Sequence, residues 1–188
     1  MRLFVAIELD DGARIAIADE QRRLKRLVGE GALKWVRPEH MHLTLAFLGE
    51  INEDRSRTLV DAMREPIACA PVAIAFGGIG MFPPNGPPRV LWVGVSSGEP
   101  EVIDIQRVVA ERVKAFGAEL EARPFHPHLT LARWRSSRQS DRRRLTGVDR
   151  RETVARINAT AVALVQSRLS SNGPTYTALC EAPLLQPL

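Results

Sequence analysis

The feature that most constrains the fold of this chain is an internal repeat. Residues 37–46 read Arg-Pro-Glu-His-Met-His-Leu-Thr-Leu-Ala, residues 123–132 read Arg-Pro-Phe-His-Pro-His-Leu-Thr-Leu-Ala, and eight of the ten positions agree. The copies lie 86 residues apart, so each half of the 188-residue chain carries one. The chain has four histidines, all of them inside the two copies: His40, His42, His126 and His128. This duplication predicts two related lobes that meet at a pseudo-symmetric cleft.

Around the repeats, strand-like and helix-like segments are mixed without strict β-α-β order. Strands are expected over residues 2–8, 33–37, 42–48, 71–77, 89–95, 128–132 and 175–181, with one or two more over 153–169. Helices are expected over 12–28, 53–66, 99–116 and 138–146. The Gly- and Pro-rich segment 77–88 is expected to form a loop, and Asn172-Gly173 a hairpin turn. The pattern predicts an α+β chain with mainly antiparallel sheets.

Composition limits the class of protein. Hydrophobic residues make up 45% of the chain and charged residues 26%, which is typical of a globular protein. We find no uncharged apolar run long enough to cross a bilayer, and the apolar N-terminal run is too short for a signal peptide. The two cysteines, Cys69 and Cys180, have neither metal nor redox spacing, so we expect free thiols in a reducing compartment. We therefore expect a cytoplasmic protein without a membrane segment.

The charge balance permits an anionic partner without requiring one. The formal net charge is +4 and the pI is about 9.7. Of the 26 basic residues 23 are arginines, a bias that fits both a GC-rich genome and bidentate phosphate recognition. Residues 133–151 alone hold eight arginines. That segment is either a basic rim for an RNA backbone or a solvated helix face.

Strand geometry shows what the repeat can do. Side chains alternate between the two faces of a strand, so His42 and Thr44 share one face while the intervening leucines enter the core. His128 and Thr130 repeat this arrangement in the second copy. Two imidazoles and two hydroxyls on facing strands suit in-line displacement at a phosphate. One imidazole takes a proton from the nucleophile, the other protonates the leaving oxygen, and the hydroxyls bind non-bridging oxygens.

Three alternatives compete with this acid–base hypothesis. A single histidine and threonine in a strand would be ordinary packing residues, but two near-identical copies make that interpretation weak. Four histidines could bind Zn²⁺ or another divalent ion. Against a metal site, the nearest acidic residue, Glu39, is expected on the opposite strand face, and threonine is a poor ligand. An RNA-binding module without chemistry is the third alternative.

The flanks of the repeat carry a family resemblance. They comprise Arg2–Ile7, Trp35-Val36, Phe47–Glu50, Gly78-x-Gly80-x-Phe82, Pro88–Trp92, Pro127–Arg133, Ser167 and Gly173-Pro174-x-Tyr176. With two His-x-Thr motifs in this context, the chain resembles the 2H phosphoesterase superfamily. Within it, the chain resembles the bacterial and archaeal RNA 2′,3′-cyclic phosphodiesterases, also called 2′-5′ RNA ligases. The resemblance spans nearly the whole chain.

The resemblance implies one bilobal domain over residues 1–188, with an antiparallel sheet and helices in each lobe and an active-site cleft between them. It implies hydrolysis of RNA 2′,3′-cyclic phosphate ends, tRNA fragments among them, to 2′-phosphate ends. Some members also join RNA ends through a 2′-5′ linkage. It implies no metal and no cofactor, and we expect a monomer.

The same resemblance implies roles for single residues. His42 and His128 are the catalytic pair, and Thr44 and Thr130 bind phosphate. We assign His42 as the acid and His128 as the base, an assignment that pseudo-symmetry allows to be reversed. Arg133 is implied as a phosphate contact, although an ideal strand would turn it to the face opposite His128.

Other residues near the motifs carry weaker expectations. His40 and His126 lie outside the signature and are expected to be exposed. Phe47 is expected in the core, while Phe82 and Trp134 are candidates for base stacking.

Overall fold

The structure, a computed structural model, describes all residues except 29–32, 121, 147–152, 172 and 187–188. Its elements are β1 (Arg2–Glu8), α1 (Asp11–Val28), β2 (Leu33–Trp35), the 3-10 turn η1 (Pro38–His40), β3 (His42–Glu50), α2 (Glu53–Ala62), β4 (Val72–Phe82), β5 (Val90–Ser97), α3 (Glu99–Ala115), β6 (His128–Trp134), α4 (Gln139–Leu145), β7 (Ala155–Ala159), β8 (Ala161–Ser170) and β9 (Gly173–Pro183). Among these described residues, no helix is long and apolar enough to cross a membrane.

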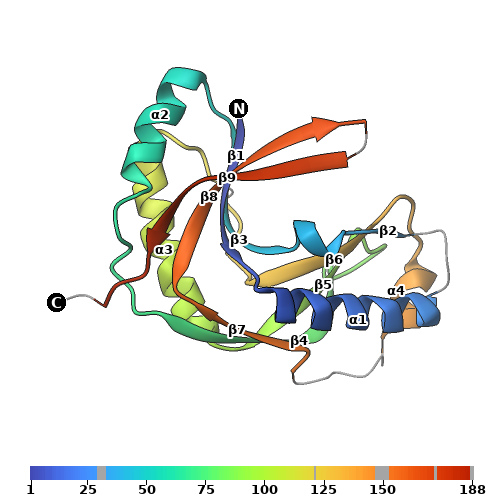
Figure 1. Cartoon of the computed structure of the whole chain (residues 1–188). Helices are drawn as coiled ribbons and strands as arrows, with labels where there is room; N and C mark the ends of the chain where they lie inside the picture. Colours follow the sequence, from blue (N-terminus) through green and yellow to red (C-terminus); the bar gives the residue numbers. More distant parts are fainter. Residues whose placement is uncertain (29–32, 121, 147–152, 172, 187–188) are drawn as a thin grey trace.

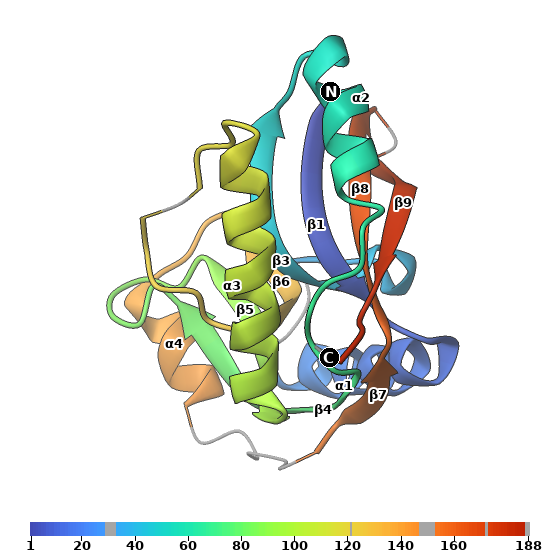
Figure 2. The ribbon, with the colours of Figure 1, turned by 90° about the vertical axis from the view of Figure 1, so that its left-hand side faces the viewer.

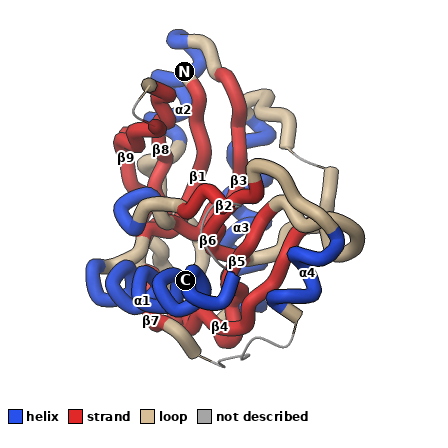
Figure 3. The backbone as a smooth tube through the Cα atoms, turned by 90° about the vertical axis from the view of Figure 1, so that its right-hand side faces the viewer, coloured by secondary structure: helices blue, strands red, loops and turns tan. Residues whose placement is uncertain are grey.

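The strands form two antiparallel sheets, as the sequence predicts. One has four strands in the order β3-β1-β8-β9, and the other has five in the order β2-β6-β5-β4-β7. Figure 3 shows the first sheet above the second. Helices α2 and α3 cover one face of the four-stranded sheet (Figure 2), and α1 lies across the five-stranded sheet beside α4 (Figure 1). The chain is thus a bilobal α+β fold.

The two halves of the chain pair their strands in the same way, at positions 86 residues apart. In the first lobe β1 pairs with β3, and Glu8 lies opposite His42. In the second lobe β5 pairs with β6, and Gly94 lies opposite His128. Gly94 lies 86 positions after Glu8, and His128 lies 86 positions after His42. This is the offset between the two copies of the motif. This pairing confirms the expected pseudo-symmetry of the lobes.

Each half of the chain contributes strands to the sheet that holds the motif strand of the other half. Strand β4, from the first half of the chain, pairs with β5 in the five-stranded sheet. Strand β8, from the second half, pairs with β1 in the four-stranded sheet. The chain passes from one sheet to the other at Thr160, the single residue between β7 and β8. The sequence leaves open whether residues 153–169 form one strand or two; the structure shows two.

The leucines of the repeats enter a common core. Leu43, Leu45, Leu129 and Leu131 are each no more than 3% exposed and belong to one cluster of buried residues from both lobes. Burying a leucine side chain stabilises the fold by about 1.5–3 kcal/mol. Turning these leucines outward would be costly. The faces of β3 and β6 that carry the motif histidines and threonines are therefore held pointing away from the core.

Two sequence-based boundaries are wrong. Residues 77–82, expected to begin a loop, continue β4 as far as Phe82 and pair with β5. The glycines there serve strand packing: a Cβ on Gly80 would overlap the Trp92 ring, and Gly78, at a register shift, has a φ of 71°. Helix α2 ends at Ala62, short of the expected Pro66, because the chain turns there to reach β4.

The hairpin after β8 is confirmed by its pairing. Strands β8 and β9 are antiparallel neighbours from Ala161 opposite Pro183 to Ser170 opposite Gly173. Asn172, the first residue of the predicted turn, lies outside the described residues, as do Gly29 and Gly31 beyond α1.

Candidate active site

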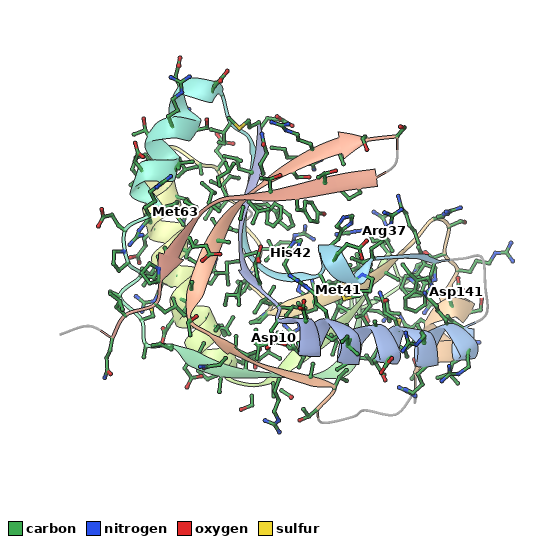
Figure 4. The ribbon with its side chains drawn as sticks, in the orientation of Figure 1. Asp10, Arg37, Met41, His42, Met63 and Asp141 are labelled. Carbon is green, nitrogen blue, oxygen red and sulfur yellow. The ribbon has the colours of Figure 1, made fainter. Side chains whose placement is uncertain are left out.

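The two motif strands meet where the two sheets adjoin. Strands β3 and β6 lie in contact, although β3 belongs to the four-stranded sheet and β6 to the five-stranded sheet. His42 and Thr44 of β3 and His128 and Thr130 of β6 are all half-buried, on the face opposite the core leucines. Figure 4 labels His42 on the side-chain view of this region. The structure thus places the four predicted residues on adjoining strands, one histidine and one threonine from each lobe.

The backbone fixes the orientation of each imidazole. Nδ1 of His128 lies 2.7 Å from the carbonyl oxygen of His126. A carbonyl only accepts a hydrogen bond, so Nδ1 carries the proton and donates it there. The backbone of His40 is the corresponding hydrogen-bond partner of His42. Nε2 of His128 is therefore left for acid–base chemistry, and its lone pair is available when the ring is neutral.

Aromatic side chains surround His42. Its ring stacks on Phe4 with centroids 4.5 Å apart, and Tyr176 of β9 meets it edge-on at 5.3 Å. Tyr176 also contacts the ring of His40 at 5.0 Å. Burial in these surroundings lowers the pKa of His42 from 6.5 to about 4, and the charge of Arg14 acts in the same direction. His42 is therefore neutral at pH 7 in the free protein.

His128 has an aromatic neighbourhood of its own. Phe82 of β4 meets the His128 ring edge-on at 5.0 Å, and Trp92 of β5 lies 6.0 Å away. Both also contact His126, at 5.6 Å and 4.9 Å. Burial lowers the pKa of His128, and the charge of Arg133 contributes in the same direction. Each lobe thus holds its imidazole against two aromatic rings.

A β-bulge explains the position of Arg133. Thr130 lies opposite Trp92 and Ala132 lies opposite Leu91, so Leu131 is an extra residue in β6. The extra residue reverses the alternation of faces, and Arg133 comes to the same face as His128 and Thr130. Burial agrees with this, because Leu131 and Ala132 are both buried while Arg133 is exposed. An ideal strand would have turned Arg133 away from His128; the bulge removes this obstacle to the phosphate contact that the family resemblance implies, which stays a prediction.

The charge of Arg133 acts on groups of both sheets. It lowers the pKa of His128, and it opposes the rise that burial causes in the pKa of Tyr176. His128 belongs to the five-stranded sheet and Tyr176 to the four-stranded sheet. The positive charge of Arg133 therefore acts on side chains of both sheets.

The same bulge occurs in the first lobe and moves Phe47. Thr44 lies opposite Ala6 and Ala46 lies opposite Val5, so Leu45 is the extra residue of β3. Phe47 consequently shares a face with His42 and is 56% exposed, with its ring 6.1 Å from Phe4. The expected core position of Phe47 is wrong for the same physical reason that applies to Arg133.

The remaining sequence candidates divide. His126 is exposed as expected, but His40 is half-buried against Tyr176. Phe82 lies beside His128, whereas Trp134 packs against the core. In the Arg-rich segment, Arg142 donates to the carbonyls of the 83–86 loop, so it has a structural role. Residues 147–151 of that segment lie outside the described residues.

Sequence reasoning did not assign Phe4, Trp92, Tyr176 or Gln21 to the site. The first three were part of the family resemblance, but only strand pairing shows that they contact the imidazoles. Gln21 of α1 is 3% exposed and donates from Nε2 to the carbonyls of Leu131 and Val36, at 2.8 and 2.9 Å. Leu131 is the bulge residue of β6, so Gln21 holds the bulge. A polar residue on a helix gives no sequence signal of such a contact.

Within the described residues, no group of three or more His, Cys, Asp or Glu side chains is placed to hold a metal ion. The two cysteines are both half-buried free thiols.

Comparison with known proteins agrees with the duplicated architecture. The family described as LigT like Phosphoesterase matches this chain twice, over residues 7–92 and 93–176. A protein of Archaeoglobus fulgidus named RNA 2′,3′-cyclic phosphodiesterase is 34% identical over 179 residues, covering 94% of this chain and 96% of the relative. A Methanothermobacter thermautotrophicus protein of the same name is 33% identical and covers 94% and 95%.

Solved structures share the fold. TT0787 of Thermus thermophilus aligns with a TM-score of 0.75 and 26% identity, covering 99% of both chains. E. coli LigT in complex with 3′-AMP aligns with a TM-score of 0.73 and 22% identity, covering 98% of both chains. The match of both halves to one family and the identity to its curated relatives lead to one conclusion: this chain is a member of the LigT-like phosphoesterases, within the 2H phosphoesterase superfamily.

Proposed function

We propose that this chain hydrolyses RNA 2′,3′-cyclic phosphate ends to 2′-phosphate ends by acid–base catalysis without a metal ion. The observation that carries the proposal is the duplicated His-x-Thr pair on adjoining strands, with Nδ1 of His128 fixed by a backbone carbonyl. The names of the relatives in Archaeoglobus and Methanothermobacter support the substrate class.

The proposed reaction uses only this chain and water. Nε2 of one imidazole takes a proton from water as its oxygen bonds to phosphorus. The bond from phosphorus to O3′ breaks, and the other imidazolium donates its proton to O3′. Thr44 and Thr130 donate hydrogen bonds to the non-bridging oxygens and so stabilise the charge that develops there, and Arg133 binds RNA phosphate beside Thr130. Each proton-transfer group contributes about 10²- to 10⁴-fold to the rate.

His42, the residue assigned as the acid, is neutral in the free protein. It must therefore gain its proton when the substrate binds. A bound phosphate anion favours the charged form of a nearby imidazole and raises its pKa. The pair is then coupled through the substrate, and a bell-shaped pH–rate profile is expected.

The reverse chemistry is part of the proposal. If the 5′-hydroxyl of a second RNA attacks phosphorus in place of water, O3′ departs as before and a 2′-5′ linkage forms. In the opposite direction the 3′-hydroxyl attacks, O5′ departs and the cyclic phosphate is restored. We further propose that tRNA fragments are among the substrates. The chain would act as one bilobal domain over residues 1–188 and as a monomer, because all four motif side chains come from one chain. We further propose a cytoplasmic location.

The test uses an RNA oligonucleotide that ends in a 2′,3′-cyclic phosphate, with EDTA present. We expect hydrolysis, and mapping of the product should find a 2′-phosphate. His42→Ala and His128→Ala should each lower turnover by about 10²-fold or more. His126→Ala is the matched control: it keeps the backbone carbonyl that orients His128 and should retain most activity.

Three results would contradict the proposal. Loss of hydrolysis in EDTA would indicate a metal-dependent enzyme. Full turnover by either His42→Ala or His128→Ala would remove the acid–base pair. Salt-sensitive RNA binding with cyclic ends left intact would indicate a binding module without chemistry.

A further inference from the structure

A second cation lies beside Arg133 on the neighbouring strand. Lys34 of β2 is directly opposite Arg133 of β6 in the antiparallel register. Its neighbours Leu33 and Trp35 turn the other way and pack against the core. Lys34 therefore shares the face of Arg133, Thr130 and His128, and both cations are exposed.

These two charges are not neutralised by the part of the fold that the structure describes. Among the ion pairs found between described residues, none includes Lys34 or Arg133. Like charges directly opposite one another across a strand pair are destabilising. An anion bound between Lys34 and Arg133 would offset that repulsion. A phosphodiester fits, because a guanidinium binds two of its oxygens and an ammonium supplies a point charge.

The position of the pair relative to the motif suggests which phosphate it takes. Thr130 lies opposite Trp92 on β5, and Arg133 lies opposite Val90, two residues further along. Two strand residues span about 7 Å, which suits neighbouring phosphates of an extended RNA strand. Lys34 is one strand further out, and β2 is at the edge of the five-stranded sheet, with no strand beyond it among the described residues.

We propose that Lys34, together with Arg133, binds the phosphodiester next to the terminal cyclic phosphate, so that the site favours an RNA chain over a cyclic mononucleotide. The inference rests on the proposed function, because that function places the terminal phosphate between the two motifs.

The first lobe has no equivalent of this cation pair. The residue 86 positions before Arg133 is Phe47, which the matching bulge brings to the corresponding place. Strand β3 is itself the edge of its sheet, so the described residues contain no counterpart of β2 beside it. Within the described residues this cation pair therefore lies on one side of the pseudo-symmetric centre, and the RNA chain leaves the centre toward β2.

The first experiment compares two substrates of Lys34→Gln: 2′,3′-cyclic AMP and an RNA tetranucleotide that ends in the same cyclic nucleotide. We expect KM for the tetranucleotide to rise about 5-fold, with kcat unchanged, and KM for cyclic AMP to stay the same. Lys114→Gln, which removes an exposed lysine of α3, is the matched control and should change neither value. Lys34→Arg should restore KM for the tetranucleotide.

The second experiment removes the charge from the RNA instead. A tetranucleotide with a neutral methylphosphonate at the last internal linkage should lose the same factor with the wild-type protein. It should lose nothing further with Lys34→Gln, because the two changes remove one interaction. Equal KM rises for both substrates, or additive losses in this cycle, would overturn the inference.

A binding measurement separates this inference from the proposed function. The same tetranucleotides can carry a 2′-phosphate end, which needs no hydrolysis, and their affinity can be followed by fluorescence anisotropy. If the wild-type protein fails to hydrolyse cyclic ends but the affinity cycle still shows coupling between Lys34 and the linkage, only the proposed function fails. If hydrolysis proceeds but neither KM nor affinity responds, only the Lys34 subsite fails.

Discussion

The two imidazoles of the site have different surroundings, although their strands are related by pseudo-symmetry. His42 stacks on Phe4 at 4.5 Å, whereas both rings near His128 approach it at an angle. Burial lowers the pKa of both histidines, in the case of His42 to about 4. The imidazole of His42 is thus neutral in the free protein at pH 7.

This shift predicts how stability depends on pH. The unfolded chain protonates His42 near pH 6.5, while the folded chain resists protonation until about pH 4. Between these values the unfolded state binds the extra proton, so the free energy of unfolding falls as pH falls. A shift from 6.5 to about 4 corresponds to at most about 3 kcal/mol at pH 4 and below. His42→Gln should therefore flatten the pH dependence of urea unfolding between pH 6.5 and 4.

The control is Lys114→Gln, at an exposed side chain of α3. That variant should keep the slope of the wild-type protein in this pH range. If His42→Gln and the wild-type protein lose stability with equal slope, His42 is not held neutral by burial.

The motif residues could be predicted from the sequence because their evidence is local. Alternation along one strand puts His42 beside Thr44 and turns Leu43 into the core, and the structure confirms both. The rings of Phe4 and Tyr176 could not be placed in this way. They reach His42 through the pairing of β1 with β3 and of β8 with β9, which are contacts between distant segments.

At the scale of elements, the bulges of β3 and β6 decide what surrounds the motifs. Each inserts one leucine after the threonine, Leu45 in β3 and Leu131 in β6, and brings the next polar or aromatic side chain to the motif face. The two bulges are held differently. The carbonyl of Leu131 accepts hydrogen bonds from Gln21 Nε2 and from the backbone N–H of Val36. The residue of α3 that corresponds to Gln21 is the exposed Arg107.

Gln21 is therefore expected to be a positioning residue that acts through Arg133. Gln21→Met keeps the volume but removes two buried hydrogen bonds, which should cost about 1–3 kcal/mol of stability. It should also lower kcat/KM for cyclic-phosphate RNA, because a loosened bulge displaces Arg133. In the Arg133→Ala background the same substitution should cause no further loss of kcat/KM.

Ser56→Ala is the matched control for a buried polar residue. Ser56 is 1% exposed, and its hydroxyl donates to the Glu53 carbonyl inside α2, far along the chain from the bulge. We expect a loss of stability without a loss of kcat/KM. An equal fall of kcat/KM for Gln21→Met with and without Arg133 would show that Gln21 does not act through Arg133.

Most helices and strands could be predicted from periodicity and turn residues. The faces of residues beyond a break in the periodicity could not. A strict period of two turns Arg133 away from the site and leaves Phe47 in the core, and one inserted residue reverses both. Glycines at 77, 78 and 80 indicate a loop when taken alone, whereas in the structure all three lie in β4, and Gly80 leaves room for the ring of Trp92. Such positions are decided by partners that the local sequence does not contain.

At the scale of the whole molecule, the two halves of the sequence do not coincide with the two lobes, because each sheet combines strands from both halves. The four-stranded sheet combines β1 and β3 with β8 and β9 from the other half of the chain. The five-stranded sheet likewise takes β4 from the first half and β5 from the second. The repeat predicts that two lobes exist, but this exchange needs pairing between segments far apart in sequence.

The exchange predicts the behaviour of a divided chain. A cut in the exposed loop at residues 84–85, between β4 and β5, leaves each fragment without a strand that its sheet requires. We expect each fragment alone to be largely unfolded by circular dichroism, since unpaired strand edges and exposed core leucines are both costly. Mixed or co-expressed, the fragments should associate in a 1:1 ratio and recover hydrolysis. A fragment that folds alone with cooperative unfolding would show that its lobe is autonomous.

The reciprocal donation of β4 and β8 also bears on how such a chain could arise. A polypeptide that carried only one repeat would complete its sheet by pairing its last strand with the sheet of a second copy, as in a domain-swapped homodimer. Two-fold symmetry would then make both imidazoles and both side chains beyond the bulge identical. Joining the copies in one gene releases that constraint: one copy can carry phenylalanine at position 47 while the other carries arginine at 133. A ligand with two different ends, such as a nucleic acid strand, can then meet a different side chain on each side of the site.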